Sequence, residues 1–146
     1  MSLAMTKPER QAFLSDVHVG VISIELAGAA PLSAPIWYDY APERGVRVIT
    51  GEGSRKGRAL AQARRFTLVA QAEQPPFYKY VSVSGPVVAV EPADLEAHSR
   101  PMARRYFGKE LGDLYVSGGG REENLVFTMR PERWLSVDYA KARPGD

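Results

Sequence analysis

Short apolar runs, many of them alternating with polar residues, extend along most of this chain. Residues 17–26 and 32–40 show the pattern on either side of a Gly- and Ala-rich turn at 27–31, and residues 46–50 show it after a second turn at 41–45. Period-two alternation and β-branched residues are typical of strands. We therefore expect a hairpin of two strands followed by a third strand.

Further apolar runs predict strands in the rest of the chain. They cover residues 65–71, 78–90, 125–130 and 133–139. Gly85 and Pro86 interrupt the longest run, and such a pair within a strand indicates a bulge or a sharp bend, as is used to curve a barrel.

Two helices are predicted from their capping residues. Residues 6–14 begin with Thr6, and Glu9 stands where a capping box requires an acid. Residues 54–63 begin with Ser54, a favoured N-cap residue.

The third and longest predicted helix covers residues 91–106, and the Gly-rich stretch 108–120 is predicted as a loop with one helical turn at 111–116. The hairpins require antiparallel pairing, and closing such a sheet into a barrel removes its edges. We therefore predict a mainly β (α+β) fold. No repeat or linker divides residues 1–146, so we expect one domain with its core at about 13–139.

Composition excludes several classes of protein. The formal charge of +2 is too small to argue for nucleic acid. No apolar run approaches the roughly 20 residues of a membrane helix, and the N-terminus lacks the apolar core of a signal peptide. The absence of cysteine excludes disulfides, thiolate catalysis and cysteine-ligated metals. We expect a cytoplasmic protein.

The basic segment that opens the helix at 54–63 is the first candidate for binding chemistry. Arg55, Lys56 and Arg58 follow Ser54 there, and each cation at a helix N-terminus costs about 0.3–1 kcal/mol unless an anion compensates. A phosphate would accept hydrogen bonds from backbone N–H groups, the Ser54 hydroxyl, Arg55 and Lys56. The alternative is an ordinary solvated basic face.

The segment Pro35-Ile36-Trp37-Tyr38 is the second candidate. Pro35 cannot donate to a sheet ladder, so it indicates an edge, a bulge or a ligand. Free main-chain groups there could hydrogen-bond the polar rim of a flavin-like ring. The alternative for Trp37 is a place in the core or in a dimer interface.

Other polar residues give weaker signals. Tyr78, Lys79 and Tyr80 could reach a cofactor edge or a substrate, or form an exposed cross-strand pair. His18 and His98 have no partner at ligand spacing, so no metal site is predicted. His18 is expected to be a hydrogen-bonded structural residue and His98 a solvent-facing helix residue. No Gly-x-Ser-x-Gly motif is present, and no catalytic residue is predicted.

Together these elements resemble the pyridoxamine 5'-phosphate oxidase-like superfamily of FMN-binding split barrels, in particular its small flavin- or F420-dependent oxidoreductases. The resemblance covers about residues 13–139. The matching segments are Phe13-Leu14, Pro31-Leu-Ser-Ala-Pro-Ile-Trp-Tyr38, Val48-Ile-Thr50, Ser54-Arg-Lys-Gly-Arg-Ala-Leu60, Phe66-Thr-Leu-Val69 and Val81-Ser-Val-Ser-Gly85.

The resemblance implies an antiparallel split β-barrel with a few short helices. It also implies a homodimer with a cofactor, FMN or the alternative F420, in each groove between the subunits. The residues it assigns to cofactor binding are Pro35, Ile36, Trp37, Val48, Ile49 and Thr50 for the ring, Ser54, Arg55 and Lys56 for the phosphate, and Tyr80, from the same or the other subunit. Residues near Trp134 would close the site.

The activity this resemblance implies is hydride transfer between the cofactor and a small apolar or aromatic molecule. Ser82 stands where pyridoxamine phosphate oxidases tend to have arginine, so that substrate is not expected. The alternative is a carrier or sensor that binds flavin, F420 or haem without catalysis, with His18 or His98 as haem ligand. A third interpretation is a dimer without cofactor that binds a peptide in the same groove.

Overall fold

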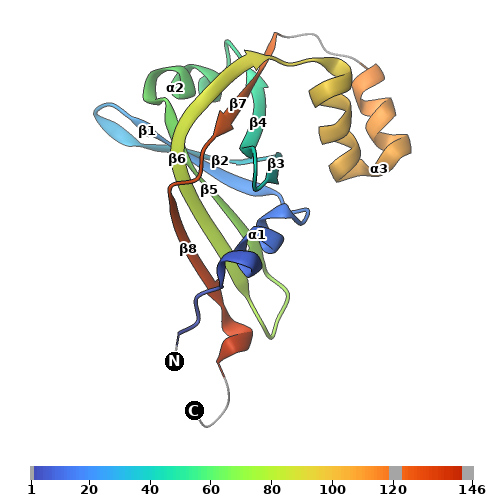
Figure 1. Cartoon of the computed structure of the whole chain (residues 1–146). Helices are drawn as coiled ribbons and strands as arrows, with labels where there is room; N and C mark the ends of the chain where they lie inside the picture. The colour runs from blue at the N-terminus through green and yellow to red at the C-terminus, as the bar shows by residue number, and fades with distance from the viewer. Residues whose placement is uncertain (1, 119–122, 143–146) are drawn as a thin grey trace.

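Eight strands form the body of the molecule in a computed structural model that describes residues 2–118 and 123–142 (Figure 1). The strands are β1 (Gly20–Leu26), β2 (Ala29–Ile36), β3 (Tyr38–Ala41), β4 (Gly45–Gly51), β5 (Arg65–Ala72), β6 (Lys79–Pro92), β7 (Asn124–Met129) and β8 (Arg133–Asp138). The helices are α1 (Lys7–Ser15), α2 (Arg55–Ala63), the π-helical turn η1 (Leu95–Ser99), α3 (Arg100–Ser117) and the 3₁₀ turn η2 (Tyr139–Lys141).

The strand order shows why the barrel is split. All pairs are antiparallel, and the order is β2-β1-β5-β6-β7-β4-β3, with β8 on β6. β2 and β3 lie at opposite ends of this order, yet only Trp37 separates them in the chain. The sheet therefore curls round until its two end strands meet at Trp37. This arrangement confirms the predicted antiparallel split barrel.

The core lies inside the curled sheet, and two helices close it. Leu14 of α1 and Leu60 of α2 are almost fully buried there. The predicted capping box of α1 is present, since the Thr6 hydroxyl accepts the Glu9 N–H and the Glu9 carboxylate accepts the Thr6 N–H. Lys141 and Thr6 lower the pKa of Glu9 to about 2. The largest fully buried side chains are Tyr38, Phe127, Leu14, Ile22, Ile24 and Leu60.

Two predicted strands have different bounds in the structure. The segment 32–40 is two strands, because its first half pairs with β1 and its second half with β4. The first strand begins at Gly20 rather than at residue 17, because His18, in the loop before the strand, packs back onto Phe13 of α1. His18 Nε2 lies 3.0 Å from the Phe13 carbonyl oxygen, and its ring stacks on Phe13. The expected structural role of His18 is thus confirmed.

The interruption of β6 at Gly85 was predicted as a bulge or bend. The register shifts between Val87 and Ala89, two residues later, and this is where β6 leaves β5 and β8 and continues beside β7. A Cβ atom on Gly85 would collide with the Arg130 carbonyl group. The glycine therefore permits the close approach of the chain that follows β7.

The predicted loop at 108–120 is wrong over its described part, except that the helical turn expected at 111–116 lies within α3. The helix continues to Ser117 and reverses direction at Gly108, whose φ of 82° and ψ of 173° are not helical. The result is a hairpin of two short helices at the side of the barrel (Figure 1). A Cβ on Gly112 would lie 2.7 Å from Arg104 Cα, so the two halves cross closely. Gly119 and Gly120 lie outside the described residues.

Ion pairs hold this hairpin together. Asp113 in the second half accepts hydrogen bonds from Arg100 at 2.9 Å and from Arg104 at 2.7 Å in the first half. These two guanidinium groups lower the pKa of Asp113 to about 2. The glycine at position 108 indicated the end of a helix. The ion pairs of Asp113 with Arg100 and Arg104 stabilise the second helix that follows it.

Candidate cofactor site

Two strand edges without a strand partner among the described residues lie next to Trp37, where β2 ends and β3 begins. The β3–β4 ladder ends at the Tyr38–Val48 pair, so no described β3 residue pairs with Ile49 or Thr50. On the other side, β2 pairs only with β1 in the described chain, up to Ile36. We call these two unpaired edges, at residues 35–36 and 49–50, the slot. Backbone donors and acceptors along it are free to meet a polar ring edge.

The N-terminus of α2 closes one end of the slot. Ser54 is its N-cap, as predicted, because the Ser54 hydroxyl accepts the Gly57 N–H at 3.0 Å. The same hydroxyl lies 3.1 Å from Thr50 Oγ1 and donates to the Gly51 carbonyl at 2.7 Å. A Cβ on Gly57 would collide with that carbonyl. These short contacts attach the first turn of α2 to the end of β4.

Two cations stand at this helix end without a partner. In the described part of the chain, no hydrogen bond or ion pair engages the side chain of Arg55 or Lys56, whereas Arg58 donates to the Gly53 carbonyl. The first-turn N–H groups of a helix have no partner within it, and the helix dipole adds positive potential. This end of the slot therefore suits an anion, and a phosphate matches the donors present.

The side chains predicted to contact the cofactor ring point in two directions. Ile36 and Val48 point into the core, so they can contribute only main-chain atoms. Val48 pairs with β3 on one side and β7 on the other, and it supports the slot rather than facing it. Pro35 is exposed on the outside, and Trp37 is half-buried there. Their assignment to a cofactor remains a prediction.

Tyr80 does not join the slot within one chain. It lies on β6, two strands beyond β1 in the sheet that contains β2. Three strand spacings of about 4.8 Å place it roughly 14 Å from β2. Its side chain lies on the same outer face of the sheet as that of Ser82. Across the strands, Ser82 pairs with Val69, Val69 with Val21, and Val21 with Pro35, so Pro35 lies on this face too. Tyr80 could therefore reach a slot only in a second subunit.

Arg105 and Tyr106 hold the slot in place, and the sequence analysis missed both. The Tyr38 N–H donates to Tyr106 Oη at 3.0 Å, and that hydroxyl donates to the His18 carbonyl at 2.6 Å. Arg105 donates to the carbonyls of Tyr38 and Asp16, each at 2.9 Å. The backbone beside Trp37 is thereby tied to the helical hairpin. Burial raises the pKa of Tyr38 above its usual range.

Aromatic rings from the hairpin surround Trp37. Tyr106 stacks on it with ring centroids 4.8 Å apart, Phe107 meets it edge-on at 5.0 Å, and Tyr115 lies at 5.6 Å. We call Trp37, Phe107 and Tyr115, with Tyr106 behind them, the aromatic group. The sequence offered a signal in its four aromatic residues, but the predicted loop at 108–120 concealed that Tyr115 is placed beside Trp37.

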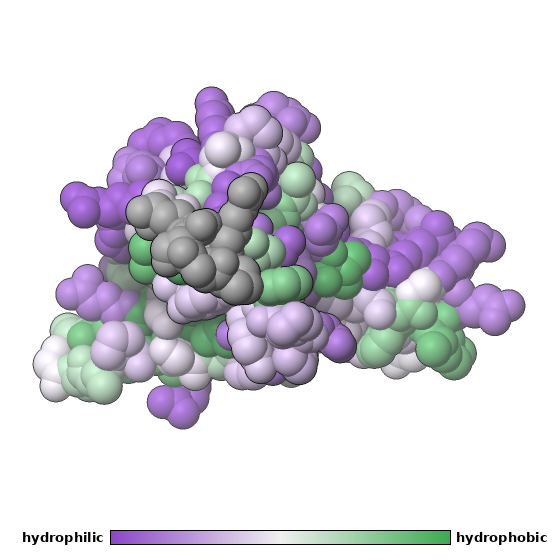
Figure 2. Space-filling model, turned by 90° about the horizontal axis from the view of Figure 1, so that it is seen from below, coloured by the Kyte–Doolittle hydropathy of each residue, from purple (hydrophilic) through white to green (hydrophobic). Residues whose placement is uncertain are grey.

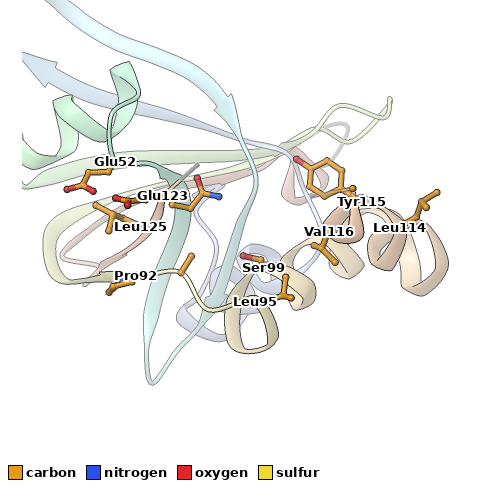
Figure 3. Close-up of a pocket in the computed structure, with 12 residues that line it drawn as sticks. Glu52, Pro92, Leu95, Ser99, Leu114, Tyr115, Val116, Glu123 and Leu125 are labelled. Carbon is orange, nitrogen blue, oxygen red and sulfur yellow. The ribbon is translucent and has the colours of Figure 1, made fainter. Parts of the chain in front are cut away.

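A groove of about 1160 Å³ separates the hairpin from the ends of β6 and β7. Leu114, Tyr115 and Val116 line one side, and Glu52, Glu123 and Leu125 line the other (Figure 3). A second hollow of about 580 Å³ at residues 51–54 shares Glu52 and Glu123 with it. The Glu52 N–H donates to the Glu123 carbonyl at 2.9 Å, and these two exposed acidic residues line the hollow beside Ser54.

The second histidine differs from its prediction. The His98 side chain is only 11% exposed, not solvent-facing, because it turns back onto β6 with Nε2 3.6 Å from Glu91. Its Nδ1 accepts the Asp94 N–H at 2.9 Å. Within residues 2–118 and 123–142 no three His, Asp or Glu side chains gather as a metal site, and no described helix is long and apolar enough to cross a membrane.

Solved structures share this fold at low identity. A conserved hypothetical protein from Mycobacterium tuberculosis is 16% identical, with a TM-score of 0.72, covering 94% of this chain and 87% of that one. A protein titled F420 reductase is 17% identical (TM-score 0.59; 86% and 94% covered). A FAD-binding protein from Mesorhizobium loti is 14% identical (TM-score 0.63; 92% and 96% covered).

These similarities at low sequence identity show the fold alone, whereas a match to a family model assigns the chain to a family. A comparison with curated proteins found no match. Residues 6–138, however, match the family described as pyridoxamine 5'-phosphate oxidase. This span runs from the cap of α1 to the end of β8 and includes the slot and the start of α2. The chain belongs to the pyridoxamine 5'-phosphate oxidase family.

Proposed function

We propose that this protein is a flavin-dependent oxidoreductase that binds FMN in the slot, with the phosphate at the start of α2. The observation that carries the proposal is the pair of cations beside the Ser54 cap, Arg55 and Lys56, which have no partner among residues 2–118 and 123–142. The main chain at 35–37 and 49–50 would orient the ring, and FMN would supply the hydride chemistry with a small apolar or aromatic molecule. Proteins titled F420 reductase and FAD-binding protein share the fold, which supports a flavin-like cofactor.

Binding titrations test this proposal. FMN and F420 are titrated separately into the purified protein, and cofactor fluorescence is followed. We expect binding of FMN, followed by slow reduction of the bound flavin by NADH or NADPH. Binding of neither cofactor would remove the proposal, and binding without any turnover would favour the second candidate, a non-catalytic flavin carrier. The cytoplasm, where flavin nucleotides are available, is the compartment we propose.

The carrier is kept because the slot holds no evident acid or base. Its described residues are apolar or hydroxyl-bearing apart from the cations of α2. A haem carrier finds less support. Both ring nitrogens of His98 are engaged, by the Asp94 N–H and by Glu91. A haem ligated by His18 would have to use Nδ1, because Nε2 is bonded to the Phe13 carbonyl and the ring is stacked on Phe13.

The outer face of the sheet supports a homodimer with the cofactor at its interface. One line of residues without charge crosses five strands on this face: Pro35, Val21, Val69, Ser82 and Leu135. Leu135 is 59% exposed, and Val21, three strands away along the same line, is also exposed. A second copy that covers this face would reach the slot at Pro35 and bring its own Tyr80 toward the cofactor. Exposed apolar surface of this kind marks interfaces.

Replacing Leu135 with arginine should break this dimer. The buried charge would oppose association, so light scattering after gel filtration should change from a dimeric to a monomeric mass, and FMN binding should fall with it. Leu111→Arg is the matched control, because Leu111 is also 59% exposed but lies on the hairpin. A wild-type monomer that binds FMN fully would exclude the interface.

Charge near the phosphate end favours FMN over F420. The glutamate tail of F420 extends beyond its phosphate, which here means past the start of α2. Glu52 and Glu123 stand at that place. A tail of carboxylates would meet both of them, whereas FMN ends at its phosphate. Like charges at exposed positions repel by a few tenths of a kcal/mol to about 1 kcal/mol each.

Neutralising these carboxylates should therefore change the preference. The double variant Glu52→Gln, Glu123→Gln is expected to bind F420 roughly three- to tenfold more tightly, while FMN binding changes less. Glu25→Gln, an exposed acid on β1, serves as control. Tighter binding of F420 than of FMN by the wild-type chain would contradict the assignment to FMN and favour F420.

A further inference from the structure

We propose that the aromatic group at Trp37 is the binding site for a planar, uncharged aromatic substrate, placed at the edge of the cofactor slot. The proposal rests on the proposed function for its redox role. The flanking side chains of Ile36 and Tyr38 are buried, so Trp37 points to the outer face of the barrel.

The rings of this group are held in place before any ligand binds. Tyr106 covers one face of Trp37 at an interplanar angle of 7°. Its hydroxyl is hydrogen-bonded to the backbone at His18 and Tyr38, which fixes the stack. Phe107 and Tyr115 also contact each other, with centroids 5.4 Å apart. A rigid aromatic surface loses little entropy when a flat ring binds.

Phe107 and Tyr115 are exposed although they contact Trp37. Their exposed fractions are 42% and 60%, and neither belongs to the buried core. Figure 2 shows hydrophobic side chains on one side of the lobe at the right, where α3 lies, and hydrophilic ones on its other side. Two aromatic side chains beside the slot are therefore exposed to solvent and are not part of the core that stabilises the fold. Exposed apolar surface of this kind marks binding sites.

The chemistry of the group selects the ligand. Aromatic rings offer stacked and edge-on contacts to another ring, and the charged group recorded close to them, Arg105, lies behind Tyr106 at 5.7 Å and is engaged by backbone carbonyls. Arg105 is thus not free to pair with a charged substrate at Trp37. A flat, neutral ring resting on Phe107 and Tyr115 would lie beside Trp37, the residue between β2 and β3 next to the slot.

Binding of 1,4-naphthoquinone to the FMN-loaded protein tests this site. Isothermal titration calorimetry should show about tenfold weaker binding of the quinone by Phe107→Ala and by Tyr115→Ala, because each variant loses roughly one ring–ring contact with it. Leu111→Ala, an exposed residue of the same hairpin outside the group, should change binding less than twofold. The chain has no cysteine, so the quinone forms no thiol adducts. Equal affinity in wild type and both aromatic variants would overturn the proposal.

Kinetics separate the site from the cofactor. Oxidation of the photoreduced holoprotein by 1,4-naphthoquinone, which takes a hydride from the flavin and a proton from water to become the hydroquinone, should slow in both aromatic variants. Oxidation by hexacyanoferrate(III), a charged one-electron acceptor, should not change. If wild type binds no FMN, the proposed function fails, and the same quinone titration on the apoprotein still decides whether Phe107 and Tyr115 form a ring-binding site.

Discussion

Lys56→Ala is expected to weaken FMN binding roughly ten- to hundredfold, because a charge-assisted hydrogen bond to a phosphate contributes about 1.5–3 kcal/mol. Lys56 has no partner among the described residues, so removing its charge breaks no contact in the apoprotein. Arg55→Ala should have a similar effect, and the double variant should lose binding almost completely at physiological salt. Fluorescence titration with FMN measures these affinities.

The sign of the stability change distinguishes a ligand site from a structural role. Removing a cation from the first turn of α2 relieves repulsion with the helix dipole, so the apoprotein should be as stable as wild type or slightly more stable. The melting temperature with saturating FMN should fall instead. Lys109→Ala, an exposed lysine on the hairpin, is the control. Unchanged FMN affinity in the double variant would place the phosphate elsewhere.

Gly85→Ala should cause the largest loss of stability, about 3 kcal/mol. The added Cβ would collide with the backbone carbonyl of Arg130, and two main-chain segments must then move apart in the middle of the sheet. Glu132 N–H donates to the Ser84 carbonyl next to this contact, so that hydrogen bond would weaken as well. For a chain of this size the melting temperature should fall by about 10 °C.

Gly53→Ala provides the matched control for this change. No atom lies within 4 Å of a Cβ at Gly53, and its φ is not in the left-handed region, so alanine should leave the melting temperature nearly unchanged. A Gly85→Ala variant that melts like wild type would show that the chain after β7 approaches β6 less closely than described. Circular dichroism at increasing temperature measures both variants.

The phosphate end of the slot could be predicted from sequence because its contacts are local. Ser54 caps a helix whose N–H donor at Gly57 is three residues away, and Arg55 and Lys56 follow it directly. The hairpin of β1 and β2 and the capping box of α1 are local in the same sense. Whether a cofactor occupies the site stays a prediction.

The ring end of the slot could not be derived in this way. The break at Trp37 arises because β2 and β3 pair with different strands, which no property of residues 32–40 reveals. Tyr106, which binds the Tyr38 N–H, lies 68 residues further along the chain. The helix after Gly108 was predicted as a loop because a glycine is a strong local stop signal, yet Asp113 and the close crossing at Gly112 stabilise it.

The sequence by itself determined most of the strands, the caps of α1 and α2, the family and the basic start of α2, because alternation, capping and charge act over a few residues. Only the tertiary structure decided that the barrel opens at Trp37, that Glu52 and Glu123 stand beside the phosphate end, and that Phe107 and Tyr115 meet Trp37. These features depend on long-range pairing and packing, whose free energy is shared among residues that are distant in the chain.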